Sequence, residues 1–132
     1  MSFTPEFVDG GRGLVFTAAG ELTAADVLAP KTIMLAEPDR LRPLRHALVL
    51  LEGVTRFAPT NDEIRDIATA DTKIALFAPD VSVAIVAPTD FLFGLSRMWE
   101  VFAEGTAWRI SVFRSRAEAD AWIRTETASR IG

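Results

Sequence analysis

The architecture of this chain is clearest in residues 81–90, which read VSVAIVAPTD. The apolar run that opens this stretch is typical of a strand covered on both faces, as in the centre of a parallel sheet. Thr89 and Asp90 at its end are residue types that begin helices. Residues 47–51, which read ALVLL, form a second such run, and a helix-start pattern follows it as well. This order predicts parallel strands joined by right-handed crossovers.

The residues before these runs predict an antiparallel hairpin. Residues 3–8 and 13–19 are strand-like, and the second of them alternates as a half-buried strand does. Asp9-Gly10 lies between them and supplies the positive φ that a tight hairpin turn needs. A helix capped by Thr23 follows, and we expect Pro30 to interrupt it with a kink.

The remaining residues continue the alternation of strands and helices. Residues 108–112 alternate as a last strand, and Ser115 with Glu118 forms a capping box for a final helix. We therefore predict a single α/β domain over residues 1–132, with about 127–132 as a frayed tail. Its sheet is mixed and mostly parallel, opens with the N-terminal hairpin and is flanked by helices.

The composition excludes several classes of function. The 132 residues are 49 % hydrophobic and 24 % charged, which is a globular mixture. The 14 basic and 18 acidic side chains give a net charge of −4, so the chain offers no field that attracts nucleic acid or an anionic membrane. The absence of Cys excludes disulfides and thiolate sites. No apolar run approaches the roughly 20 residues of a membrane span, and we expect a cytoplasmic protein.

The residue types predict no catalytic, metal or cofactor site. Ligands in open α/β sheets sit beyond the carboxyl ends of the strands, whereas His46 begins a predicted strand at the opposite end. We interpret His46 as a structural residue bonded to nearby backbone. Gly10-Gly11-Arg12-Gly13 lies in the hairpin rather than between a strand and a helix, so it does not match a phosphate-binding loop. We expect no cofactor, no metal and no enzymatic activity.

The predicted helix over residues 91–102, FLFGLSRMWEVF, carries more apolar surface than one sheet face covers. The side chains that share its expected inward face at 100° per residue are Phe91, Leu95, Met98, Trp99 and Phe102. Surplus apolar surface is usually buried against a partner or a ligand. The candidate residues for such an interface or apolar pocket are Leu92, Phe93, Arg97 and Val101. The alternative is that a neighbouring loop covers Phe93.

Asp71 is out of place on a continuous helix. It would lie among Ile64, Ile67 and Ala75, and a lone buried carboxylate is costly. Our preferred interpretation is that the helix breaks there and Asp71 caps a new turn. The alternative is that Asp71 is hydrogen-bonded at the rim of the sheet.

A family resemblance runs from Gly13 to about Glu126. The stretches that carry it are Gly20-Glu21-Leu22-Thr23, Val83–Asp90, Phe93–Trp99 and Val112-Phe113-Arg114-Ser115, with Ala119 and Trp122. In these stretches the chain resembles the STAS-like proteins related to the sporulation anti-sigma factor antagonist. In particular it resembles the bacterial branch of small proteins similar to stage II sporulation protein AA. The resemblance implies a mixed sheet flanked by helices and no established enzyme activity.

Thr60 occupies the position that the resemblance marks as regulatory. In true antagonists a Ser beside an Asp-Ser-Ser-Gly motif, at the start of the helix after the third strand, is phosphorylated by a partner kinase. The matching stretch here is Ala58-Pro59-Thr60-Asn61, which keeps a hydroxyl but lacks the Asp, the second Ser and the Gly. Thr60 with Glu63 also forms a capping box. We therefore interpret Thr60 mainly as a cap, with a regulatory hydroxyl as the alternative.

Two hypotheses for function follow. The first is a non-enzymatic STAS-like domain that acts through protein–protein contact, as a homodimer. The second is a carrier or sensor of a small apolar, lipid-like ligand, because the same branch is also similar to lipid-carrying domains of the CRAL-TRIO type. The two differ in what covers the helix that carries Phe93.

Overall fold

A computed structural model describes the backbone of residues 2–131 and the side chains of residues 2–128. Its strands are β1 (Ser2–Val8), β2 (Gly13–Leu22), β3 (His46–Phe57), β4 (Ser82–Val86) and β5 (Arg109–Phe113). Its helices are α1 (Ala24–Leu35), α2 (Asn61–Ala75), α3 (Asp90–Phe102) and α4 (Arg116–Ile131), with short 3-10 turns at Asp9–Gly11, Pro38–Arg40 and Glu104–Thr106.

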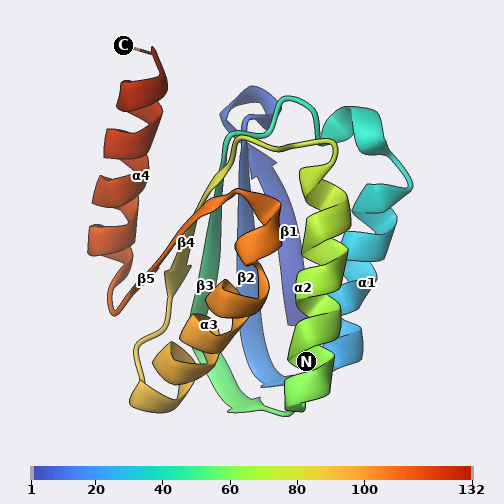
Figure 1. Ribbon diagram of the computed structural model, residues 1–132. Coiled ribbons are helices and arrows are strands. Elements are labelled where there is room, and N and C mark those ends of the chain that lie inside the picture. The colour runs from blue at the N-terminus through green and yellow to red at the C-terminus, as the bar shows by residue number, and fades with distance from the viewer. Residues whose placement is uncertain (1, 132) are drawn as a thin grey trace.

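The strands form one five-stranded sheet in the order β1-β2-β3-β4-β5. The pair β1–β2 is antiparallel, and the other three pairs are parallel (Figure 1). The prediction of an α/β fold with a mixed, mostly parallel sheet is therefore confirmed, as is the opening hairpin. None of the helices within residues 2–131 is long and apolar enough to cross a lipid bilayer.

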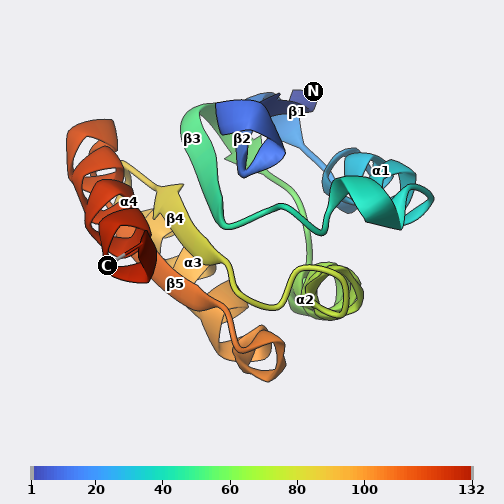
Figure 2. The ribbon, with the colours of Figure 1, turned by 90° about the horizontal axis from the view of Figure 1, so that it is seen from above.

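The helices cover the two faces of the sheet unequally. Figure 2 shows α1, α2 and α3 along one face and α4 alone on the other. Strand β4 is buried on both sides, because Val83 and Ile85 belong to the apolar cluster under the three helices while Ala84 and Val86 belong to the cluster under α4. This double burial explains the unbroken apolar sequence of its residues 83–86.

Side-chain caps begin the helices, as their sequences predict. The Thr23 hydroxyl accepts the amide hydrogen of Asp26, and the Asp26 carboxylate accepts that of Thr23. Hydrogen bonds to the Asp26 carboxylate, first from the Thr23 backbone N–H and then from the Thr23 side chain, hold the pKa of Asp26 below its usual value. Thr60 and Glu63 form the same reciprocal pair at the start of α2. The predicted capping boxes at Thr23 and Thr60 are therefore confirmed.

Two expected interruptions of helices are wrong. Helix α1 continues through Pro30 to Leu35, because the face that carries Val27, Pro30 and Met34 is buried and its packing outweighs the lost hydrogen bond. Helix α2 continues through Asp71 to Ala75. Asp71 does not cap a new turn, because it finds polar partners on two other helices.

The inward face of α3 differs in part from the prediction. Its buried side chains are Leu92 and Ser96, and Leu95 and Trp99 of the expected face are half-buried, whereas Phe91 is 63 % exposed. Ser96 can be buried because its hydroxyl donates to the Leu92 carbonyl at 2.8 Å. The helix is thus turned so that a satisfied serine, rather than Phe91, faces the interior.

His46 is the first residue of β3, at the amino end of the parallel strands, as predicted. Its Nε2 lies 3.3 Å from Asp9 Oδ2. A Cβ atom on Gly13 would clash with the side chains of His46 and Val8, so a larger residue here would require them to shift. At the other end of the chain, residues 127–131 of the expected frayed tail belong to α4, and residue 132 lies outside the described residues.

Candidate functional site

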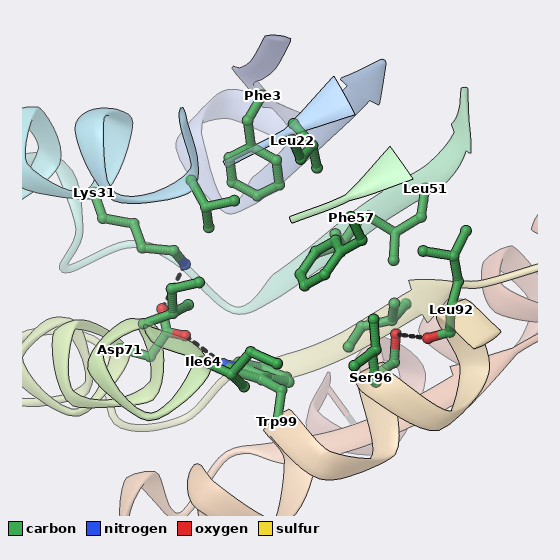
Figure 3. A pocket seen from close by; sticks show the side chains of 15 residues that line it. Phe3, Leu22, Lys31, Leu51, Phe57, Ile64, Asp71, Leu92, Ser96 and Trp99 are labelled. Atoms are coloured by element: carbon green, nitrogen blue, oxygen red, sulfur yellow. Dashed lines mark hydrogen bonds and ion pairs between the residues drawn. The ribbon is translucent and has the colours of Figure 1, made fainter. Parts of the chain in front are cut away.

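An apolar cavity of about 90 Å³ lies between the sheet and α1, α2 and α3 (Figure 3). Most of its 15 lining side chains are aliphatic or phenylalanine. The lining residues are Phe3, Leu22, Val27, Lys31, Val49, Leu51, Phe57, Ile64, Ile67, Asp71, Ile85, Leu92, Leu95, Ser96 and Trp99. Every strand except β5 contributes at least one of them.

The cavity extends to the carboxyl ends of the central strands. Leu22 and Phe57 are the last residues of β2 and β3, and Leu92 lies in the first turn of α3. This is the side of an open α/β sheet where ligands usually bind. Phe57 and Leu95 are only half-buried, so side chains rather than backbone separate the cavity from solvent there.

One wall of the cavity is a buried polar network. Lys31 Nζ of α1 donates to Asp71 Oδ1 of α2 at 2.6 Å, and Trp99 Nε1 of α3 donates to Asp71 Oδ2 at 2.9 Å. Lys31 is 7 % exposed and Asp71 is 1 % exposed. The two opposite charges compensate each other away from water, and each carboxylate oxygen has a donor. The network ties three helices together at fixed spacing.

Aromatic rings cover the other side of the ammonium group. Lys31 Nζ lies 5.3 Å from the centroid of Phe16 and 6.0 Å from that of Phe3, and these two rings stack on each other at 4.5 Å. A cation over aromatic faces is attracted by their quadrupoles. Lys31 is therefore held by the carboxylate on one side and by ring faces on the other.

The polar network also separates two cavities. A second cavity of about 50 Å³ lies deeper, toward the amino ends of the strands. The residues that line both cavities are Lys31, Val49, Asp71 and Trp99. The Lys31–Asp71–Trp99 network is thus a partition inside the space between the sheet and the three helices.

The four candidate residues of α3 differ in burial. Leu92 is 5 % exposed and lines the larger cavity, so it is not surplus apolar surface. Phe93 is half-buried, and the guanidinium of Arg114 lies 4.4 Å from its ring centroid. Arg97 is exposed and lies 3.6 Å from Glu100, and Val101 is 58 % exposed. The Arg114 side chain, just after β5, therefore lies over part of the Phe93 ring.

A polar cleft of about 720 Å³ lies at the opposite end of the sheet. Its lining residues are Asp9, Gly10, Arg12, Pro43, Arg45, His46, Asp80 and Thr127. Acidic and basic side chains balance there, and no serine or cysteine is among these lining residues to act as a nucleophile beside His46. In the described part of the chain, no group of three or more His, Cys, Asp and Glu side chains could hold a metal ion.

Lys31 is the functional candidate that the sequence reasoning missed. It shares one helix face with Val27 and Met34, at the spacing of an apolar stripe, and all three are buried. A lysine at an apolar position of a buried face is a signal for a buried partner. Asp71 gives the matching signal, because it is a carboxylate at an apolar position of the next helix and could be the partner of a buried lysine.

Comparison with known proteins leaves the site to be interpreted from its geometry. No protein-family model matches the chain, and no curated protein matches it.

Proposed function

We propose that this protein is a non-enzymatic, STAS-like domain that binds a small apolar molecule in the cavity between the sheet and α1, α2 and α3. The observation that carries the proposal is the cavity itself. Protein interiors rarely leave voids larger than a water molecule. The side chains that line this apolar space of about 90 Å³ lack packing partners on that side, and a bound apolar ligand supplies those contacts.

The size of the cavity limits the ligand. An engineered apolar cavity of about 150 Å³ takes up benzene. The cavity here is smaller but reaches the carboxyl-end rim, where half-buried side chains border it. At the same volume per atom it holds about four non-hydrogen atoms, so a longer apolar molecule extends from it to the carboxyl-end rim.

Protein–protein contact, the first hypothesis from the sequence, has weaker support. It rested on surplus apolar surface at Leu92, Phe93 and Val101, and the first two of these are covered. The large apolar side chains that are exposed lie on or beside three different helices: Ile33, Leu76, Phe91 and Val101. A homodimer, a protein partner and a cytoplasmic location stay predictions. The mixed sheet with its flanking helices supports the STAS-like part of the proposal.

Titration with 2-methyl-1-pentene, followed by the methyl resonances of the protein in NMR spectra, tests the proposal. We expect saturable shifts for Leu51, Ile64 and Leu92, whose side chains line the cavity. Ser96→Leu fills the cavity from α3 and should abolish these shifts. Arg97→Leu is the matched control, since it adds the same side chain one residue away on the exposed side of the helix.

The outcome is decisive when both variants keep the wild-type amide spectrum. Saturable shifts in wild type and in Arg97→Leu, but not in Ser96→Leu, support the cavity as the site. Shifts that never saturate, or that persist unchanged in Ser96→Leu, contradict it.

A further inference from the structure

The hydrogen-bonding capacity of Lys31 is only partly used. A lysine ammonium has three N–H donors. In the part of the chain that the structure describes, its one oxygen acceptor is Asp71 Oδ1, and aromatic rings cover its other side. Asp71 itself has a donor on each oxygen, from Lys31 and Trp99. The wall of the cavity therefore offers donor capacity but no unused carboxylate oxygen.

We infer that Lys31 recognises a neutral oxygen acceptor, such as a carbonyl group, on the ligand, and that Asp71 makes the site reject an anionic one. This inference rests on the proposed function, because it names the chemistry of the molecule that the cavity binds.

Charge balance separates the two kinds of ligand. The Lys31–Asp71 pair is already neutral, so a carbonyl oxygen that accepts from Lys31 Nζ adds no charge to the interior. A carboxylate would add a negative charge next to Asp71, which is 1 % exposed and poorly screened by water. A hydrocarbon of the same shape would add no charge but would leave the free N–H donors without a partner.

The placement of the residues sets the orientation of the ligand. In Figure 3, Lys31 and Asp71 lie at one side of the cavity, and Leu51, Phe57 and Leu92 lie at the opposite side. A ligand that spans this space has its oxygen at the polar partition and its hydrocarbon part toward the carboxyl-end rim. The ligand class is therefore a neutral molecule with one terminal or near-terminal carbonyl oxygen and an aliphatic body.

Three matched probes test this inference in the intact protein: 2-pentanone, 2-methyl-1-pentene and butanoate. They have the same number of non-hydrogen atoms and the same propyl chain. The alkene replaces the ketone oxygen with a methylene group, and butanoate replaces the ketone methyl group with a charged oxygen. We expect the wild type to bind 2-pentanone about tenfold more tightly than the alkene, as a hydrogen bond from a charged donor allows. Butanoate should bind most weakly.

Two variants test whether the Lys31–Asp71 pair causes the preference for the ketone over the alkene. Lys31→Met with Asp71→Asn removes both charges together, so it leaves no buried ion unpaired, and it should bind ketone and alkene equally. Asp71→Asn alone leaves the lysine charge uncompensated, and it should reverse the order so that butanoate binds more tightly than the ketone. The indole N–H resonance of Trp99, which reports on its bond to residue 71, gives a readout independent of affinity.

The outcomes separate this inference from the proposed function. If the alkene binds saturably but the wild type shows no ketone preference, or binds butanoate best, the inference is wrong and the proposed function stands. If none of the three probes binds, both are wrong. A ketone preference that survives in the folded double variant overturns the role of Lys31. Should a variant not fold, the three wild-type affinities still decide the matter.

Discussion

The two faces of the sheet are covered in different ways. Helix α4 lies directly on β3 and β4, and Ala119 at 0 % exposure packs against Ala84 and Val86. On the other face three helices surround a cavity, and a buried ion pair with an indole holds them together. Alternate residues of the same strands supply both faces, so the strand sequences alone do not cause this difference.

The difference lies in what the helices bring to the interface. From α4, Ala119, Trp122 and Ile123 meet the sheet with apolar side chains alone. On the opposite face, Lys31, Asp71 and Trp99 contribute long polar or aromatic side chains that must satisfy one another. Their network fixes the distance between α1, α2 and α3, so the helices cannot close onto the space beside it. A polar network can therefore keep an apolar cavity open.

The largest expected effect comes from removing the centre of that network. Asp71→Ala leaves the Lys31 charge buried without a partner and the Trp99 N–H without an acceptor. We expect a loss of about 3–5 kcal/mol in the free energy of unfolding, measured by urea denaturation. Asp120→Ala is the control on α4, where the carboxylate is half-exposed 3.6 Å from Arg116, and it should cost less than about 1 kcal/mol. Similar losses in the two variants would mean that the network does not hold the helices.

Placing a larger side chain on each face of the sheet should change the free energy of unfolding by less, but in opposite directions on the two faces. Ala119→Leu forces a larger side chain into the close-packed contact under α4, and we expect it to lower the free energy of unfolding by about 1–3 kcal/mol. Ser96→Leu puts the same side chain into the cavity, and we expect a gain of about 0.5–1 kcal/mol. Thermal and urea unfolding of the two proteins measure this contrast. Equal destabilisation would show that the cavity face is as tightly packed as the α4 face.

Removing a helix cap should have the smallest effect on the free energy of unfolding. This effect should be equal for helices on the two faces of the sheet. Thr60→Ala removes the cap of α2 on the cavity side, and Ser115→Ala removes the cap of α4, whose hydroxyl accepts the amide hydrogen of Glu118 at 3.3 Å. Each should lower the free energy of unfolding by about 1 kcal/mol. Mass spectrometry of the protein from its native host addresses the regulatory alternative. Stoichiometric phosphate on Thr60 would contradict its interpretation as mainly a cap.

Much of the fold could be predicted because its signals are local. The apolar runs at residues 47–51 and 81–87, the turn at Asp9-Gly10 and the capping box at Thr60 each depend on residues within a few positions of one another. Neighbouring residues impose these preferences whatever the rest of the chain does. They were enough to predict alternating strands and helices and the mixed sheet.

The candidate site could be predicted only in fragments. The sequence marked Asp71 as anomalous and the α3 segment as too apolar, but it did not connect either of them to Lys31. Its expected inward face for α3 holds for Leu95 and Trp99, which line the cavity, but not for Phe91, because periodicity does not account for a buried serine that bonds within its own helix. The break expected at Asp71 was wrong for a related reason. Its partners, Lys31 and Trp99, lie on other helices, and local sequence does not identify them.

Sequence alone was therefore sufficient for the class of fold, the helix starts and the position of His46 away from the carboxyl-end rim of the sheet. The tertiary structure was needed for the cavity, its polar partition and the orientation of α3. Lys31 and Asp71 are 40 residues apart, and Asp71 and Trp99 are 28 residues apart. The cost of burying each of these groups is offset only when all three helices meet, so their roles depend on packing between distant segments rather than on local preference.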